Sequence, residues 1–425
     1  MTKKSDAPAI RFKGFSDAWE QRKLSEIADK VTEKNAGLQY VETFTNSAEF
    51  GIISQRDFFD HDIAKLGSLD GYYIVKNEDF VYNPRISTSA PVGPINRNKL
   101  GRTGVMSPLY TVFRPHDVDT TYLEHFFKCA YWHSFMNFNG DSGARSDRFS
   151  IKDDVFFQMP IPLPYIDEQR KIGELLTRLD HLITLHQRKF EKLTNVKKSM
   201  LEKMFPQNGS SYPEIRFKGF TDPWEQRKLG EIGSVSMCRR IFKEQTSETG
   251  DIPFYKIGTF GADPDAFISR ELFEEYKSKY PYPQKGDILI SASGSIGRAV
   301  EFAGNNEYFQ DSNIVWLNHD ERLSNPFLKC FYSVVKWAGI EGSTIKRLYN
   351  DNILNTVICM PSVPEQKRIG LFFENLDNLI TLHQRKCVFL FGFFQAFISM
   401  IFTASTFSWE QRKFSDVVAT RRGLT

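Results

Sequence analysis

The sequence predicts an α/β protein built as an internal repeat, in which two globular domains of mixed strands and helices alternate with two long helices. Two near-copies within the chain support this prediction. Arg11–Ile27 returns at Arg216–Ile232 with 14 identities in 17 positions, and Asp180–Lys189 returns at Asp377–Lys386 with 9 in 10. The long stretches between the near-copies differ, so each half combines a shared frame with a private insert. Two such halves imply a pseudo-twofold arrangement.

Each private insert follows a shared opening and is typical of a compact α/β domain. Aromatic and β-branched runs such as Gly71–Pro84 and Gln284–Gly297 are bounded by Gly, Pro, Asn and Asp, which indicates short strands joined by turns. Each insert ends at a proline-rich boundary, Met159–Ile172 or Met360–Ile369, and proline suits the first turn of a helix. We therefore expect the two domains at residues 1–164 and 208–363.

The long helices are expected at residues 165–207 and 364–404. In both, apolar residues recur at alternating spacings of four and three, which predicts the seam of a coiled coil. His186 and His383 hold equivalent seam positions, where a polar residue fixes register at some cost in stability. This role, or that of a simple histidine at the solvent edge, is favoured over a catalytic one. The predicted helix–helix seam consists of Ile172, Leu176, Leu179, Ile183 and His186 in the first helix and Ile369, Phe373, Leu376, Ile380 and His383 in the second.

Two features distinguish the C-terminal end of the chain. Cys387–Ala404 is 18 residues long without a charge, which is long enough for a membrane span. The seam pattern continues to Ile401, however, so burial against another helix or a partner is favoured over a membrane. Residues 405–425 then begin a third copy of the opening, because Trp409–Val417 repeats Trp19–Ile27. Packing of this tail beside the first opening and a remnant of recombination both stay open.

Composition indicates an ordinary cytoplasmic protein. The chain has 425 residues, 41% hydrophobic and 25% charged, and its net charge of +3 does not by itself argue for nucleic acid. Five cysteines without a C-x-x-C or zinc spacing suit a reducing compartment. The N-terminal residues contain no apolar stretch typical of a secretory signal.

No catalytic motif stands out. The sequence contains no P-loop, no H-E-x-x-H and no G-x-S-x-G. Ser291–Arg298 is glycine-rich but lacks the P-loop lysine, so it predicts a turn between strands. Asn83-Pro84 is similar to the Asn-Pro of adenine methyltransferases, but Arg85-Ile86 replace the expected residues, and a turn at a strand end is favoured. The eight histidines show no metal-ligand spacing. We therefore expect a non-catalytic chain that binds no metal or cofactor itself.

Three segments are candidates for contact with double-stranded DNA. Ser142–Phe149 and Gly342–Tyr349 both precede a proline boundary and combine Gly, hydroxyls and cationic side chains, and Arg85–Pro91 is similar in character. Arg can read guanine through two hydrogen bonds, and hydroxyls or backbone N–H groups can hold phosphates. An ordinary solvated loop is the alternative for each segment. The candidate DNA-binding residues are Arg85, Ser87, Arg145, Ser146, Arg148, Arg298, Lys346, Arg347 and Tyr349.

The chain resembles the specificity subunits of bacterial type I restriction–modification systems. The residues that carry the resemblance are WEQRKL at a domain start, PYIDEQRKI and PEQKRI before the helices, and LITLHQRK within them. The order of variable region, helix, variable region, helix covers nearly the whole chain. The resemblance implies that the private domains are target-recognition domains, each reading one half of a split, asymmetric DNA sequence. It also implies that the two long helices pair antiparallel and act as a ruler between the domains.

Partners and cofactors follow from the same resemblance. The helices would dock two modification subunits, which bind S-adenosylmethionine and flip an adenine, and a separate restriction subunit would use ATP and Mg²⁺ to translocate and cut. The chain departs from the family pattern in its apolar second helix and truncated third copy. Two other functions stay open: a coiled-coil adaptor without DNA contact, and a bifunctional methyltransferase or nuclease fusion, against which the missing motifs argue.

Overall fold

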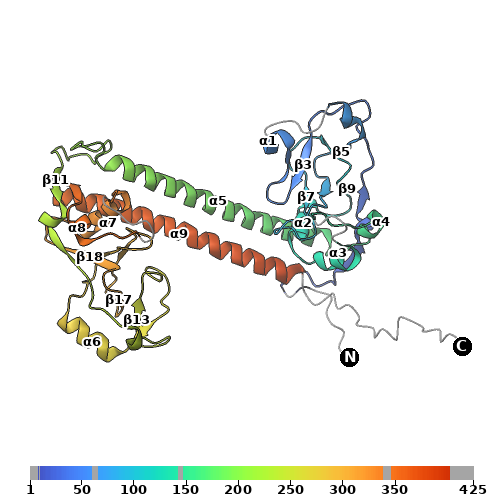
Figure 1. The fold of residues 1–425 in the computed structure, drawn as a ribbon. Coiled ribbons are helices and arrows are strands. Elements are labelled where there is room, and N and C mark those ends of the chain that lie inside the picture. The colour runs from blue at the N-terminus through green and yellow to red at the C-terminus, as the bar shows by residue number, and fades with distance from the viewer. Residues whose placement is uncertain (1–7, 9, 60–65, 142–146, 338–345, 403–425) are drawn as a thin grey trace, which may run out of the picture. The chain divides into compact units, whose positions relative to one another are not determined.

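The computed structural model describes residues 8, 10–59, 66–141, 147–337 and 346–402. The chain divides into two units, of which the first takes Met1–Leu185 with Lys386–Thr425 and the second takes His186–Arg385. Two helices, α5 (Ile166–Met204) and α9 (Val363–Phe402), are shared between the units (Figure 1). The first half of α5 and the second half of α9 belong to the first unit, and the remaining halves belong to the second.

Each unit contains a four-stranded antiparallel sheet with the same strand order. In the first unit the order is β2 (Ala28–Lys30), β9 (Thr111–Pro115), β6 (Phe80–Tyr82) and β7 (Ile95–Arg97). In the second unit it is β12 (Gly233–Ser236), β18 (Ile314–His319), β15 (Ile288–Ser291) and β16 (Ala299–Glu301). The private inserts therefore share a topology although their sequences differ, and the predicted α/β repeat is confirmed.

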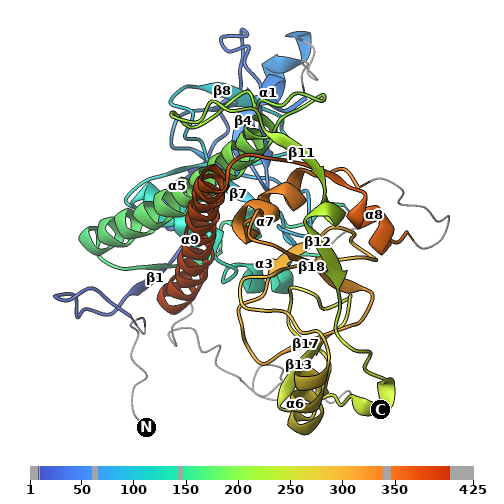
Figure 2. The same ribbon diagram turned by 90° about the vertical axis from the view of Figure 1, so that its left-hand side faces the viewer.

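The other elements differ between the units. The first unit adds the hairpin β3 (Phe44–Ser47) and β4 (Gly51–Ser54), the pair β5 (Tyr73–Val75) and β8 (Gly104–Met106), helices α1 (Gln55–Phe59), α2 (Thr120–Lys128), α3 (His133–Asn139) and α4 (Asp153–Phe156), and 3₁₀ turns at Leu24–Glu26 and Leu66–Gly71. The second adds a three-stranded sheet in the order β14 (Phe267–Ile268), β13 (Ile252–Tyr255) and β17 (Tyr308–Phe309), helices α6 (Arg270–Lys279), α7 (Asn325–Val334) and α8 (Asn350–Leu354), and 3₁₀ turns at Leu229–Glu231 and Lys243–Gln245. Helix α6 lies beside β13 and β17 in both views (Figures 1 and 2).

The shared opening forms a short strand that pairs with the proline boundary. β1 (Glu20–Lys23) is antiparallel to β10 (Pro160–Leu163), and β11 (Glu225–Lys228) is antiparallel to β19 (Val357–Met360) in the same register. The repeated Glu-Gln pair that begins each long helix has a clear structural role. Glu168 accepts two hydrogen bonds from Arg11, both 2.7 Å long, and Glu365 accepts the same pair from Arg216. These bidentate ion pairs fix each opening to its helix.

A second shared attachment joins α2 or α7 to the long helix. The side chains of Gln169 and Gln366 accept hydrogen bonds of 2.9 Å from the backbone N–H groups of Asp119 and Ser324, which directly precede α2 and α7. Glycines allow this close approach, because a Cβ on Gly370 would lie 2.4 Å from Pro326 at the start of α7. In each unit a shorter helix, α2 or α7, therefore connects the private sheet to the long helix.

Within each unit the halves of α5 and α9 run antiparallel. In the second unit, Nδ1 of His186 lies 2.8 Å from Nδ1 of His383, and Lys197 forms an ion pair with Asp377. In the first unit, the Cys387 thiol lies 3.6 Å from the carbonyl oxygen of Ile183. The seam residues named from the sequence are all buried or half-buried along this contact.

The apolar end of α9 is buried on one face only. Phe394, Phe397, Ile398, Ile401 and Phe402 pack into the core of the first unit. Val388, Phe389, Phe391 and Phe393 are exposed on the other face. Among the described residues, α9 is the one helix whose length and composition could cross a membrane, and 28% of its most apolar window is buried. The heptad positions at this end of α9 are thus buried in the first unit, whereas a second apolar face of the helix is exposed.

Candidate nucleic-acid interface

In the first unit, two of the segments singled out in the sequence lie side by side. The loop between β6 and β7 carries Arg85, and the segment before α4 carries Arg148, and these two residues form an antiparallel backbone bridge. The N–H of Ile86 donates to the carbonyl of Asp147 at 3.0 Å, and the N–H of Phe149 donates to that of Pro84 at 2.7 Å. The fold thus joins two cationic segments that are far apart in the sequence.

The second unit builds the same junction from different residues. The loop between β15 and β16 meets the segment before α8, where Ser293 and Arg347 form an antiparallel bridge. The N–H of Leu348 donates to the carbonyl of Ala292 at 2.7 Å. Because β6–β7 and β15–β16 hold equivalent places in the two sheets, the loop pairs are equivalent as well. We call them the first and second loop pairs.

Close backbone contacts fix the shape of the β6–β7 loop. Ser87 and Ala90 exchange backbone hydrogen bonds of 3.0 and 3.1 Å, and the Ser87 hydroxyl accepts another from the N–H of Ala90. Gly93 has φ +85°, and a Cβ there would lie 2.1 Å from the carbonyl oxygen of Asn83. Only glycine fits this position. The loop is therefore a shaped turn, as the Asn83-Pro84 segment predicted, and Ser87 is partly engaged in holding it.

The cations of the first loop pair are accessible. The Arg85 side chain is 67% exposed and lies 3.8 Å from Asp147, which is also exposed. Such a surface ion pair contributes little energy, so a phosphate or a base edge can replace Asp147 at small cost. Arg148 is half-buried and lines a cavity beneath the loops. Arg145 and Ser146, the other two candidates in this segment, lie outside the described residues.

The cavity beside the first loop pair contains residues that the sequence analysis missed. Its volume is about 450 Å³, and its walls include Arg85, Arg148, Tyr110, Phe58 and Phe59. Phe58 and Phe59 contact each other edge-on at 4.6 Å, and both are more than one-third exposed. Aromatic faces next to cations are suited to nucleic acid, because bases stack on the rings and thymine methyl groups contact them. The sequence signal that could have indicated this surface is the pair Phe58-Phe59 within an otherwise polar stretch.

The arginines of the second loop pair are each anchored by one hydrogen bond and keep further N–H donors for other contacts. Arg347 donates one hydrogen bond of 2.9 Å to the carbonyl of Ser312, and its guanidinium lies 5.8 Å from the ring centre of Tyr349. Arg298 donates one bond of 2.8 Å to the carbonyl of Gly261. A guanidinium has five N–H donors, so each can contact DNA while keeping this anchor. Lys346 and Tyr349 are exposed beside them.

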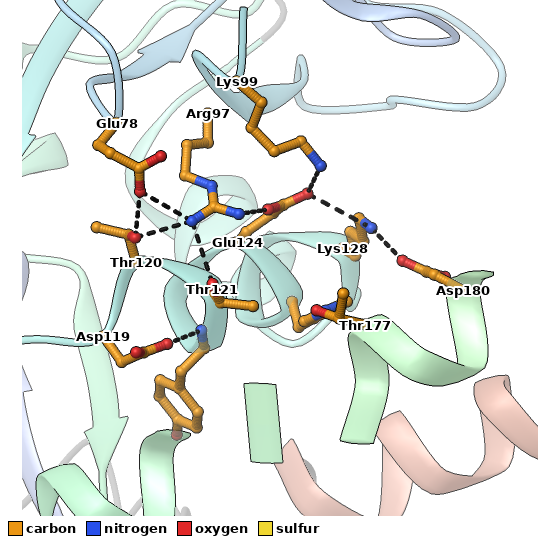
Figure 3. A network of polar contacts seen from close by, with 12 residues as sticks. Glu78, Arg97, Lys99, Asp119, Thr120, Thr121, Glu124, Lys128, Thr177 and Asp180 are labelled. Atoms are coloured by element: carbon orange, nitrogen blue, oxygen red, sulfur yellow. Dashed lines mark hydrogen bonds and ion pairs between the residues drawn. The ribbon is translucent and has the colours of Figure 1, made fainter. Parts of the chain in front are cut away.

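A polar network joins the end of β7 to α2 and α5 (Figure 3). Arg97, at the end of β7, contacts Glu124 of α2 and Glu78, and Lys128 joins α2 to Asp180 of α5 at 2.6 Å. Burial by itself would raise the pKa of Glu124, but Lys128, Lys99 and Arg97 lower it below its usual value. The carboxylate therefore stays charged and ties β7 to α2, which Lys128 joins in turn to α5.

The described residues contain no metal-ligand cluster, and two of their buried thiols are unreactive. Among them, no group of three or more His, Cys, Asp or Glu is placed to hold a metal ion. Burial raises the pKa of the Cys129 and Cys238 thiols to about 12, so neither is an activated nucleophile. What the sites offer is hydrogen-bond donors, positive charge and aromatic surface on shaped loops.

The family model for the type I restriction modification DNA specificity domain matches residues 16–195 and 221–387. The two matches cover most of the chain, which therefore belongs to this family of DNA specificity proteins. The two copies of the domain correspond to the two halves of the repeat, each match including most of one opening, one four-stranded sheet and part of a long helix. The resemblance seen in the repeated motifs is confirmed.

Particular relatives agree with this assignment. A protein of Haemophilus influenzae, named provisionally as a type I restriction enzyme specificity subunit, is 49% identical over 242 residues, which are 56% of this chain and 62% of that protein. The MjaVIII specificity subunit of Methanocaldococcus jannaschii is 23% identical over 251 residues, 55% of this chain and 58% of that protein. The matches thus span about 60% of these relatives' own length. The crystal structure of a type I S subunit from M. genitalium shares the fold, with a TM-score of 0.60 at 13% identity over 93% of this chain and 99% of that one.

Proposed function

We propose that this chain is the DNA-recognition subunit of a type I restriction–modification complex and that each unit reads one half of a split DNA sequence. The observation that carries the proposal is the pair of equivalent loop junctions. The frame residues are nearly the same in both units, whereas Arg85 of the first loop pair corresponds to Ser293 of the second, and the loops that carry them differ in length, residues 83–94 against 292–298. Equivalent positions with different side chains are what the recognition of two different half-sites requires.

The loops supply the two kinds of contact that sequence recognition needs. Exposed cations and hydroxyls can bind phosphates and position the duplex, and arginines next to aromatic rings can read base edges. The net charge of +3 is small, so binding depends on gathering cations at the loop pairs rather than on the charge of the whole chain.

The helices provide equivalent surfaces for partner proteins. Identity between the repeats at buried positions follows from packing, but identity at exposed positions does not. Leu182 and Leu185 of the first unit are 40% and 38% exposed, and the matching Leu379 and Leu382 of the second unit are both 44% exposed. Two equivalent apolar patches fit two copies of one partner, which supports two modification subunits docked on the helices.

The chemistry of the complex belongs to those partners in this proposal. S-adenosylmethionine binds to the modification subunits, and ATP and Mg²⁺ bind to a restriction subunit, while this chain binds no cofactor and is not itself an enzyme. The complex acts on chromosomal DNA, so we place the chain in the cytoplasm.

Methylome sequencing of cells that express this chain with its modification subunit tests the proposal. A bipartite methylated motif is expected, and methylation that needs no partner would instead favour a fused methyltransferase. Purified complex is then measured on the cognate duplex. Arg148→Ala and Arg347→Ala should each weaken cognate binding by about 1–3 kcal/mol and relax one position of their own half-site. The exposed Lys13 and Lys285 lie outside the loop pairs, and their change to Ala should leave both half-sites intact. Unchanged binding in all four variants would favour an adaptor that does not contact DNA.

The ruler role of the helices is tested by insertion at the boundary between the units. Seven residues inserted after His186 and seven after His383 keep the heptad register within each unit and lengthen each helix by about 10 Å. The gap in the methylated motif should increase by about three base pairs, because B-DNA rises about 3.4 Å per step. Insertion in α5 alone is the control and should disrupt the helix pair. An unchanged gap in an active doubly inserted variant would show that other elements set the spacing.

A further inference from the structure

The strand that opens the first unit is held in a single, well-defined place. β1 pairs with β10 so that Glu20 faces Leu163 and Lys23 faces Pro160, and β11 pairs with β19 in the same register. Trp19 and Trp224 directly precede these strands and are both buried. The sequence Trp-Glu-Gln-Arg-Lys therefore specifies one structure twice: a buried indole followed by a strand on the proline boundary.

β10 can accept only one partner strand. Pro160 and Pro162 have no backbone N–H, so Ile161 and Leu163 are its remaining donors. Successive residues of a strand direct their N–H groups to opposite edges, so Ile161 and Leu163, which are two residues apart, donate at the same edge. β1 occupies that pairing. Another strand can pair with β10 only by replacing β1.

The chain contains a further sequence that fits this place. Trp409–Val417 reads WEQRKFSDV where Trp19–Ile27 reads WEQRKLSEI. The tryptophan, the whole strand and the following serine are identical, and the three differences keep the chemical character of the side chain. The tail therefore carries every side chain that β1 uses in pairing with β10.

The end of α9 lies within reach of the Trp19 site. In the second unit the ring of Phe205, at the end of α5, is 5.8 Å from Trp224. In the first unit the equivalent Phe402 is 5.4 Å from Tyr122, whose ring is 6.3 Å from Trp19. Trp409 follows Phe402 by seven residues, and seven residues can span up to about 25 Å. The reach is sufficient within one chain.

We propose that Trp409–Val417 is a spare strand that takes the place of β1 on β10 of the same chain when the N-terminal segment is displaced. The N-terminal segment holds the place otherwise, because it alone brings the Arg11–Glu168 ion pair and the contact of Lys171 with the Phe15 ring at 4.8 Å. The residues before Trp409, Thr403–Ser408, contain no cation that could replace Arg11. Either of two segments of the chain can thus complete the pairing with β10, and this inference does not depend on DNA recognition.

A matched pair of tryptophan variants tests the proposal, in the full chain and in a chain ending at residue 405. Thermal unfolding is followed by hydrogen exchange of the peptides that contain β10 and β19. Trp224→Ala should lower the midpoint at β19 by about 10 °C in both chains, because loss of a buried aromatic side chain leaves a cavity. Trp19→Ala should lower the midpoint at β10 by less than half as much in the full chain, and by the whole amount in the shortened chain.

Equal losses for Trp19→Ala with and without the tail would overturn the proposal. A loss of stability from Trp409→Ala in the otherwise unaltered chain would also overturn it, because the tail would then be packed elsewhere at all times. A photo-crosslinking residue in place of Gln411 locates the strand directly. In the Trp19→Ala chain it should react with residues 160–163 of the same molecule. Crosslinked dimers, or products at other positions, would reject exchange within one chain.

Discussion

The two units of this protein are alike where they meet the long helices and different where their sheets end in loops. Arg11 and Arg216 form the same bidentate pair with the first glutamate of the helix motif, at the same distances. The four-stranded sheets have the same order, yet the β6–β7 loop spans residues 83–94 and the β15–β16 loop spans only 292–298. Packing against a helix admits few solutions, whereas a solvated loop can change as long as its strands stay in register. The fold thus separates a surface that must be constant from one that is free to vary.

Exchange of a whole private insert is the strongest test of this separation. Replacing residues 30–158 with the matching region of another family member should change one half of the methylated motif completely and leave the other half intact. The expected preference for the new half-site over the old one is at least about a thousandfold, which is the lower range of sequence-specific binding. Methylome sequencing measures both halves at once. A change in both halves, or in neither, would mean that the units are not separable modules.

Loss of the ion pair between the opening and the long helix should destabilise both units equally. Glu168 and Glu365 are almost fully buried, so removal of the arginine leaves a buried carboxylate without its partner. Arg11→Met and Arg216→Met should each cost about 3–5 kcal/mol of unfolding free energy in their own unit. Arg→Lys at the same positions keeps the charge but loses the bidentate geometry, and should recover part of the loss. Denaturant unfolding measures each value, and clearly unequal costs would show that the two junctions are equivalent in geometry only.

The sequence alone predicted the frame well, and physical reasons explain where it stopped. The openings and the seam were visible because the chain repeats them. The attachment of α2 and α7 was missed, because the two helices share little beyond Leu123 with Leu328 and Phe126 with Phe331. Their common role depends on hydrogen bonds donated by backbone N–H groups. A residue of almost any type can supply such a group, so these contacts are hardly visible in the sequence.

The two loop pairs were predicted only in part. Their cations and hydroxyls marked them as candidates, but the pairing of Arg85 with Arg148 joins residues far apart in the chain and depends on how the sheet folds. The cavity with Phe58 and Phe59 has the same origin. The exposed face of α9 shows a different limit: heptad spacing indicated correctly which residues are buried, but it could not show that Phe389 and Phe391 remain exposed.

Acid should lower the stability of the first unit more than that of the second, because α2 carries His125 where α7 carries Cys330. Burial lowers the pKa of His125 to about 3, whereas the unfolded chain titrates near 6.5. Between these values the unfolded state takes up a proton that the folded state does not. The contribution of His125 to the stability of the first unit is therefore fully present above about pH 6.5 and falls by up to about 1.4 kcal/mol per pH unit below it.

A substitution that imitates the second unit isolates this effect. His125→Cys should remove about 2 kcal/mol of the stability difference between pH 7.5 and pH 5, measured by urea unfolding at the two pH values. The comparison uses only the change with pH, so a constant cost of the substitution does not enter. The second unit of the same molecule serves as the internal control. An unchanged pH dependence would show that His125 becomes protonated in the folded state.

The smallest expected difference lies in one hydroxyl group. Tyr122 donates a buried hydrogen bond of 2.6 Å to the carbonyl of Pro162 in β10, whereas the equivalent Phe327 has no hydroxyl to offer β19. Tyr122→Phe therefore gives the first unit the residue type that the second unit has at this position. It should cost about 1 kcal/mol of unfolding free energy, because the buried carbonyl of Pro162 loses its hydrogen-bond donor. Hydrogen exchange at Ile161 and Leu163 would reveal the local loosening. Because both rings pack against a buried tryptophan, a loss of several kcal/mol would contradict a purely local bond and show that the hydroxyl determines how β10 is placed against α2.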